Sequence, residues 1–290
     1  MQILTYSCSF AQTPIAPSVS ALYSLPTFIL AMYRATAAIS YSKIDCGNLL
    51  TYNDSVRLSD QLQAICNGKH AQSASLDLQA SVVRKLENDI KALDTFAKRA
   101  YGAEMEAQRT VLRDMLDGAQ GFSNCTTPPF AGECDSAIAM TIDRIGEVYH
   151  QWQPVLSHSA LLQSIGSLLS TALSKIIMDV EDLSDIGEEE SKTLRSYCSS
   201  MSTLNSMFVQ QHPGSNETRD MTGLYCPNWL KFQYLAEILD GSLADIKYLW
   251  TDGELSLEFG VEEIVDLIEA LFADSDYRRR AISDIRRSGR

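Results

Sequence analysis

The 290-residue sequence contains few of the residues that interrupt regular secondary structure. It has 15 glycines and 8 prolines, too few for the many tight turns of a β-sandwich or β-barrel. Hydrophobic residues make up 45% of the chain and charged residues 21%, so the chain can bury a sizeable core and is not disordered as a whole. At roughly 150 residues per domain, the length indicates one elongated domain or two smaller ones.

Basic residues are also scarce. The 24 lysines and arginines face 37 aspartates and glutamates, which gives a formal charge of −13. Because a chain with this balance repels the phosphate backbone, we expect no nucleic-acid partner and look for protein partners instead.

Charged side chains are absent from the first 33 residues. A secretory signal needs a basic residue ahead of its apolar run, and none is present. A membrane span needs about 20 unbroken apolar residues, whereas Pro14, Pro17 and Pro26 interrupt this stretch. We therefore expect no membrane span, a loose end over residues 1–17 and a buried first helix near residues 22–40.

Motifs for catalysis and cofactor binding are missing. The sequence has no phosphate-binding Gly-x-x-x-x-Gly-Lys-Ser/Thr or Gly-x-Gly-x-x-Gly, and no Gly-x-Ser-x-Gly around a nucleophilic serine. Its four histidines form no zinc-binding pair at helical spacing. A cysteine–histidine nucleophile pair stays open, because such pairs form in space rather than in sequence. We expect no enzyme activity, no cofactor and no metal site.

The seven cysteines are scattered and odd in number, and none forms a Cys-x-x-Cys pair. Structural zinc and a regular disulfide framework are therefore disfavoured. We expect reduced, mostly buried thiols in a cytosolic protein at Cys8, Cys46, Cys66, Cys125, Cys134, Cys198 and Cys226.

Helical periodicity dominates what is present. Residues 75–117 contain no proline and a single glycine, and their apolar residues recur mostly three and four apart, which predicts one long helix. The expected buried face is Leu76, Val83, Leu86, Ile90, Leu93, Ala97 and Ala100, and the expected solvated face is Arg84, Lys85, Asn88, Lys91 and Lys98. Residues 159–182 are apolar around most of the circumference, which predicts a central, buried helix.

The remaining pattern predicts helices separated by polar loops. We expect a loop over residues 120–134, a helix over 135–153, a surface loop over 210–220 and one helix from about 225 to 250. The fold class is all-α, with eight to ten helices in elongated antiparallel bundles. We assign a helical bundle to residues 18–133 and a C-terminal helical domain to residues 134–290.

Two acidic runs stand out. The first lies between residues 179 and 190, and it predicts a helix start capped by Ser184 or Asp185, with glutamates at the positive end of the helix dipole. Calcium binding is the alternative, but the EF-hand spacing is missing. The second run, residues 252–276, holds nine carboxylates and surrounds an amphipathic helix.

Arginines follow the second acidic run, beginning with Arg278, Arg279 and Arg280. We expect them to pair with the acids just upstream and to complement the carbonyl end of a last helix. Contact of this tail with anionic lipid or nucleic acid is the alternative.

The three tryptophans lie at expected helix ends, at Trp152, Trp229 and Trp250. A tryptophan in such a position staples a helix end to its neighbour or anchors an interface with a partner.

Several segments, taken in order, resemble a known family. They are LLQSIGSLLSTALSKIIMDVEDLSDIGEEES, then YCPNWLKF, then LAEILDGSLADIKYLWTDG, and finally IVDLIEALFADSDYRRRAISDI. The sequence is similar to the carboxy-terminal part of the Zeste-White-ten centromere/kinetochore family, whose signature is an aromatic-x-Pro-x-Trp-x-x-Phe segment, a Trp-x-Asp-Gly step and a final helix with paired arginines. Members of that family are much longer than this chain.

The resemblance implies a non-enzymatic, all-helical rod in a vesicle tethering complex at the endoplasmic reticulum, acting in Golgi-to-ER retrograde transport. The implied partners are other tether subunits, chiefly a large helical subunit of the NAG or Rough Deal type, and indirectly ER SNAREs. The implied location is cytoplasmic and peripheral at the endoplasmic reticulum, and the kinetochore in mitosis. The alternative is a kinetochore and spindle-checkpoint adaptor that recruits dynein.

The residues that we single out as partner-binding residues or structural anchors lie in the segments that carry the resemblance. They are Tyr225, Pro227, Trp229, Phe232, Trp250, Arg278, Arg279 and Arg280.

Overall fold

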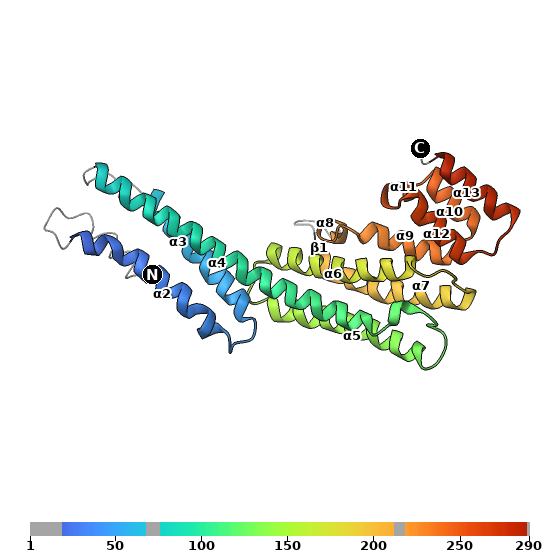
Figure 1. Ribbon diagram of the computed structural model, residues 1–290, viewed down its shortest axis with the longest axis horizontal. Coiled ribbons are helices and arrows are strands. Elements are labelled where there is room, and N and C mark those ends of the chain that lie inside the picture. Colours follow the sequence, from blue (N-terminus) through green and yellow to red (C-terminus); the bar gives the residue numbers. More distant parts are fainter. Residues whose placement is uncertain (1–18, 68–75, 212–217, 289–290) are drawn as a thin grey trace. The chain divides into compact units, whose positions relative to one another are not determined.

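The computed structural model describes residues 19–67, 76–211 and 218–288 (Figure 1). These residues form 12 α-helices, two short 3₁₀ helices and a single pair of short strands. The all-α fold class is therefore confirmed. The helices outnumber the expected eight to ten because the C-terminal part of the chain is divided into several short ones.

The chain divides into two compact units. Unit 1 is Met1–Ala107 with Pro154–Leu156, and unit 2 is Gln108–Gln153 with Ser157–Arg290. The loop at which we placed a domain boundary, before residue 134, lies within unit 2.

Unit 1 is built from three helices, which are α2 (Val19–Tyr41), α3 (Gly47–Asn67) and most of α4 (Leu76–Asp117). Leu30 of α2 and Leu62 of α3 are buried in one cluster with Leu86, Ile90 and Leu93 of α4. The long helix is thus confirmed, and of its expected buried face Leu86, Ile90, Leu93 and Ala97 are buried and Ala100 is half-buried. The side chains of Leu76 and Val83 lie outside the described residues. The five residues expected on the solvated face of α4 are exposed, as an amphipathic pattern requires.

Unit 2 is centred on α6 (His158–Glu181), whose apolar side chains are mostly buried along its length, with Met178 as an exposed exception. It packs against α5 (Phe130–Trp152), α9 (Trp229–Asp240) and α12 (Val261–Leu271), and α7 (Glu188–Ser202) packs on α5 and α9. The central, buried helix expected over residues 159–182 is confirmed. Within the described residues α6 is also the one helix long and apolar enough to cross a membrane, but 61% of its most apolar window is buried in the protein, as in a core helix.

Shorter elements complete unit 2. Between α4 and α5 lies the 3₁₀ helix η2 (Gln120–Phe122), and after α7 come η3 (Thr203–Phe208), β1 (Val209–Gln211) and β2 (Thr218–Asp220). The C-terminal part holds α8 (Thr222–Tyr225), α10 (Leu243–Thr251), α11 (Leu255–Glu258) and α13 (Asp276–Ser288). The amphipathic helix expected within the second acidic run is confirmed as α12.

Two predicted loops contain more regular structure than expected. Helix α5 begins at Phe130 rather than after residue 134, with Pro129 as its N-cap residue. Residues 210–220 were expected to be a surface loop, yet β1 and β2 pair as antiparallel strands with Gln210 opposite Arg219.

Two helix boundaries were predicted wrongly. The helix expected over 225–250 is two helices, because Ser242 caps α10: its hydroxyl accepts from the backbone N–H of Asp245, and the Asp245 carboxylate accepts from the N–H of Ser242. The cap of α7 is Gly187 rather than Ser184 or Asp185, and the Glu190 carboxylate accepts from its N–H at 3.0 Å. The glutamates of the first turn of α7 are confirmed.

Candidate functional site

The segment from Tyr225 to Phe232 joins α8 to α9 and lies against α6. Gly166 permits the close approach, because a Cβ at this position would lie 2.3 Å from the carbonyl oxygen of Tyr225. The Asn228 side-chain amide donates to the carbonyl oxygen of Ser170 at 3.0 Å and to Ser174 Oγ at 2.9 Å. A glycine and two polar positions on α6 thus fix where this segment sits.

The aromatic side chains of this segment point into the core of unit 2. Phe232 is fully buried and Trp229 nearly so, with their ring centroids 6.3 Å apart. The Tyr225 ring is half-buried and stacks on Phe208 at 6.1 Å, whereas Pro227 is exposed. Pro227 and, further along the segment, Leu230 therefore face solvent.

Lys231 connects α9 to two other helices. Its Nζ donates to Glu263 Oε2 of α12 at 3.0 Å and lies 3.0 Å from Glu181 Oε1 of α6, without a well-aligned hydrogen bond to the latter. Burial raises the pKa of the Glu181 carboxyl. Burial also works against the charge of Lys231, but the two carboxylates outweigh it and raise its pKa.

Trp250 and Arg278 join the C-terminal helices. Trp250 Nε1 donates to Ser288 Oγ at 3.1 Å, which ties the end of α10 to the end of α13. Arg278 donates to the carbonyl oxygens of Glu269 and Phe272 at the end of α12, at 3.2 and 2.6 Å. Such contacts satisfy carbonyls that a helix end leaves without a partner.

The expected pairing of the arginines with upstream acids is confirmed for three of them. Arg278 and Arg279 pair with Asp274, and Arg286 pairs with Glu262. Arg280 is exposed and forms no ion pair with any residue that the structure describes.

The described cysteines offer no reactive thiol in the core. Four of them are buried free thiols, as expected, and Cys46 is half-buried. Cys8 and the side chain of Cys66 lie outside the described residues. Burial raises the pKa of Cys198 and of Cys226 to about 12, which keeps these thiols protonated and poorly nucleophilic at neutral pH. Among the described residues no three histidines, cysteines or carboxylates come together as a metal site would need.

An open groove of about 730 Å³ lies beside the Tyr225 segment. Its walls come from the part of α4 in unit 2, from a row of polar residues on α6, and from the exposed side of the α8–α9 connection. Sequence reasoning found Tyr225 and Pro227 here but missed the two arginines of α4 that face them, Arg109 and Arg113. The available signal was the polar row Ser167, Ser170, Thr171 and Ser174 on an otherwise apolar helix, which packing alone does not require.

The sequence profile described as the ZW10 C-terminal helical domain matches residues 136–285, half of the chain. The chain belongs to the ZW10 family. The ZW10 match spans α6 through α12 and includes all eight residues singled out from the sequence, from Tyr225 to Arg280. The resemblance seen in the sequence is thereby confirmed.

Several relatives carry the ZW10 name. The chain is 26% identical over 189 residues to the mouse (Mus musculus) centromere/kinetochore protein zw10 homolog, a match that covers 63% of this chain and 24% of the relative. It is 23% identical over 268 residues to the Arabidopsis thaliana homolog, covering 91% and 36%, and 25% identical over 198 residues to centromere/kinetochore protein zw10 of Drosophila melanogaster, covering 67% and 26%. The matched regions thus span about a quarter to a third of these relatives, and neither their names nor the family description names an enzyme activity.

Proposed function

We propose that this chain acts through protein–protein contacts, as the C-terminal helical part of a non-enzymatic subunit of an ER-associated vesicle tethering complex. Membership of the ZW10 family carries this proposal. The role in Golgi-to-ER retrograde transport follows from the family resemblance, as do the partners, a large helical subunit of the NAG or Rough Deal type and, indirectly, ER SNAREs. The proposed location is cytoplasmic and peripheral at the endoplasmic reticulum.

A kinetochore and spindle-checkpoint role is the second candidate. It is favoured by the names of the relatives from mouse, Arabidopsis and Drosophila, each of which is called a centromere/kinetochore protein. Both candidates use the same scaffold and differ in the complex that holds it.

Within this scaffold we propose different tasks for the eight residues. The burial of Trp229 and Phe232 and the hydrogen bond of Trp250 support a structural role, as do the contacts of Arg278 and Arg279 with neighbouring groups. Tyr225, Pro227 and Arg280 are at least partly accessible, which supports a partner-facing role for them.

Affinity capture with the tagged chain tests the proposal. We expect interphase extract to yield a large NAG-type helical subunit together with ER SNAREs, identified by mass spectrometry. Recovery of Rough Deal type subunits from mitotic extract, without the ER set, would move the assignment to the kinetochore. A second bait with Phe232→Ala is the control, and circular dichroism checks its folding. Because Phe232 is buried, proteins that this bait captures in larger amounts bind to exposed core residues rather than to the native surface.

A further inference from the structure

We propose that the groove between α4, α6 and the α8–α9 connection binds an acidic peptide segment of a partner protein, one that carries an apolar side chain next to its carboxylates. The groove lies wholly in unit 2 and has a volume of about 730 Å³. This volume is within the usual range of ligand-binding pockets in proteins. This inference goes beyond the proposed function, because it concerns the chemistry of a ligand and can hold or fail whichever complex contains the chain.

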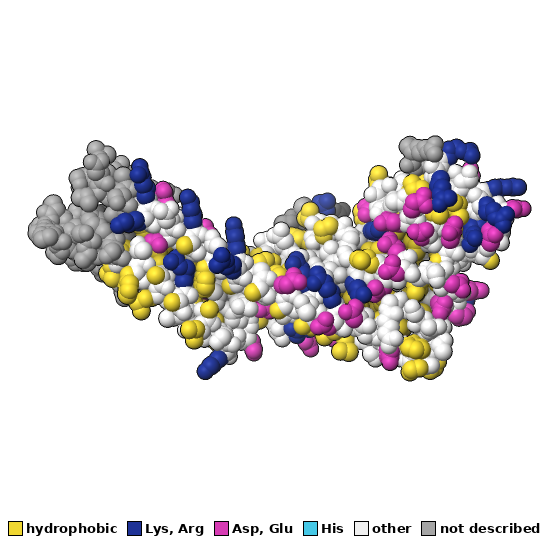
Figure 2. Space-filling view, viewed as in Figure 1, with side chains coloured by type: hydrophobic (Ala, Val, Ile, Leu, Met, Phe, Trp, Pro, Cys, Tyr) yellow, Lys and Arg dark blue, Asp and Glu magenta, His cyan; other side chains and the backbone are white. Residues whose placement is uncertain are grey.

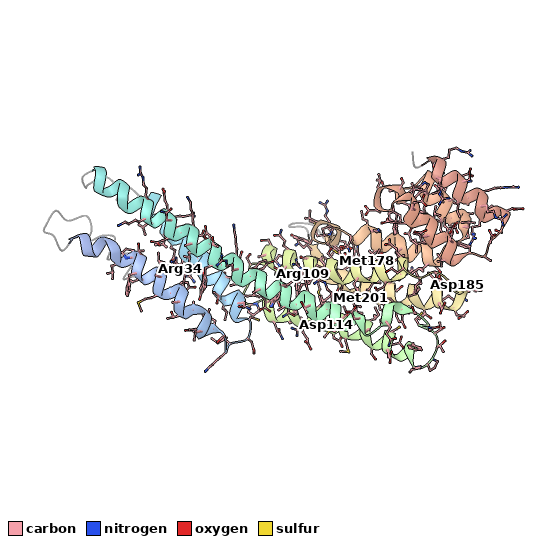
Figure 3. All side chains as sticks on the ribbon, viewed as in Figure 1. Arg34, Arg109, Asp114, Met178, Asp185 and Met201 are labelled. Carbon is pink, nitrogen blue, oxygen red and sulfur yellow. The ribbon has the colours of Figure 1, made fainter. Side chains whose placement is uncertain are left out.

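Charge selects the ligand. Arg109 and Arg113 line the groove, and none of its described lining residues is acidic, although the chain as a whole carries a formal charge of −13. Figure 3 places Arg109 where α4 runs beside α6, and Figure 2 shows Lys and Arg side chains close together in this area, with Asp and Glu side chains beside them. A guanidinium keeps its charge and carries five N–H donors, so each arginine can contact a carboxylate in addition to the partners it has within the protein. Two arginines one helical turn apart therefore favour a segment with more than one acidic side chain.

The floor of the groove is polar and held in place. Arg109 Nη2 donates to Ser167 Oγ at 2.8 Å, which fixes the guanidinium against α6. Asn228 Nδ2 donates to Ser174 Oγ at 2.9 Å, and Thr171 lies between the two serines along the helix. Thr171 Oγ1 donates to the carbonyl oxygen of Ser167 at 3.0 Å, so each of the three hydroxyl groups has a partner within the protein. A hydroxyl can form more than one hydrogen bond, which lets these groups also bond to the backbone of an incoming peptide.

The third wall is apolar. Leu224 is 67% exposed and Pro227 is exposed beside it. Tyr225 belongs to the same wall, and aromatic residues and arginine are the side chains enriched at protein interfaces. The apolar wall predicts that a peptide with carboxylates alone binds weakly and that a leucine next to the carboxylates strengthens its binding.

Fluorescence anisotropy with the full 290-residue chain tests this proposal. The probe is a short fluorescein-labelled peptide in which glutamates surround one leucine, and the comparison peptide has lysine in place of each glutamate. We expect the acidic peptide to bind, the lysine peptide not to bind, and added salt to weaken binding. Absence of binding by the acidic peptide, or full competition by inorganic phosphate, would overturn the proposal.

Matched variants locate the site. Arg109→Gln with Arg113→Gln should weaken binding by at least about tenfold, and Leu224→Ser should weaken it by a smaller factor. Arg286→Gln with Arg287→Gln removes the same charge from α13 and should change binding little. Because Arg109 contacts α6, Arg113→Gln alone is tested as well, and circular dichroism checks each fold. Equal loss in the two double variants, or no loss in Arg113→Gln and Leu224→Ser, would contradict the proposal.

Discussion

The two acidic runs look alike in the sequence but differ in the folded protein. In the first run, Asp179 and Glu181 lie at the end of the central helix α6, and burial raises the pKa of both carboxyls. In the second run, Glu262 and Asp274 are exposed, and ion pairs with Arg286 and Arg279 lower their pKa values. At neutral pH the two buried carboxylates therefore oppose folding, whereas the exposed, paired ones support it. Glu188 of the first run belongs to the second kind, because its hydrogen bond with Lys192 lowers its pKa.

Position relative to the core makes this difference. Asp179 is 8% exposed, its Oδ1 accepts from Lys175 Nζ at 2.9 Å, and its Oδ2 has no hydrogen-bond partner among the described residues. Asp274, by contrast, stays in water, where an ion pair costs little desolvation. Acidic runs should thus be interpreted by the burial of each carboxylate rather than by their density.

Among the changes that test this comparison, replacement of Lys231 should have the largest effect on stability. Replacing it with methionine leaves the Glu181 carboxylate in the core without its cation and removes the link to Glu263, so we expect the free energy of unfolding to fall by about 3 kcal/mol. Urea unfolding monitored by circular dichroism measures the change. Lys192→Met is the matched control, because Lys192 pairs with Glu188 and Glu189 in solvent; equal losses in the two variants would contradict the distinction.

A smaller loss is expected at Arg278. Replacement with alanine removes the hydrogen bonds to the carbonyls of Glu269 and Phe272 and the pairing with Asp274, which should lower the stability by about 1–2 kcal/mol. Thermal unfolding gives the measurement, with Arg280→Ala as the control because Arg280 forms no such contact with the part of the chain that the structure describes. A midpoint that falls as far in Arg280→Ala would argue against the capping role.

The smallest effect is a pH dependence of opposite sign in the two runs. The folded-state pKa values of Asp179 and Glu181 lie above the ordinary 3.8 and 4.5, so their contribution to stability is present below those values and is lost as the pH rises. The pKa values of Glu262 and Asp274 are lowered, so their contribution is present above pH 4.5 and 3.8 and is lost as the pH falls.

Two double variants, each with two carboxylates replaced by amides, measure this difference in pH dependence. Relative to the unchanged chain, Asp179→Asn with Glu181→Gln should become more stable as the pH rises from about 3 to about 7, and Glu262→Gln with Asp274→Asn should become less stable. Urea titrations across that range give both slopes. Slopes of the same sign would show that burial does not separate the two runs.

Much of the fold could be predicted from local pattern. The long helix α4, the buried helix α6 and the amphipathic helix α12 each follow from the spacing of apolar residues, because one period of 3.6 residues persists over many turns. The break at Ser242 had a signal in the sequence, because Gly241 directly follows α9 and Ser242 forms a capping box with Asp245. It was missed because the apolar spacing on both sides was given more weight than these boundary residues.

The candidate site was predictable only in part. The segment from Tyr225 to Phe232 was found because its aromatic residues and proline match a family signature. Arg109, Gly166 and Lys231 were missed, since a glycine or a single cation in a helix gives no local sign of what lies opposite it.

The sequence by itself determined the fold class, the order of the principal helices and the ZW10 family, because apolar periodicity and signature residues are properties of neighbouring positions. Only the tertiary structure decided which carboxylates are buried, which aromatic residues fill the core, and that the arginines of α4 face Pro227 across α6. Desolvation and ion pairing depend on distances between segments far apart in the chain, and these distances arise when the helices pack.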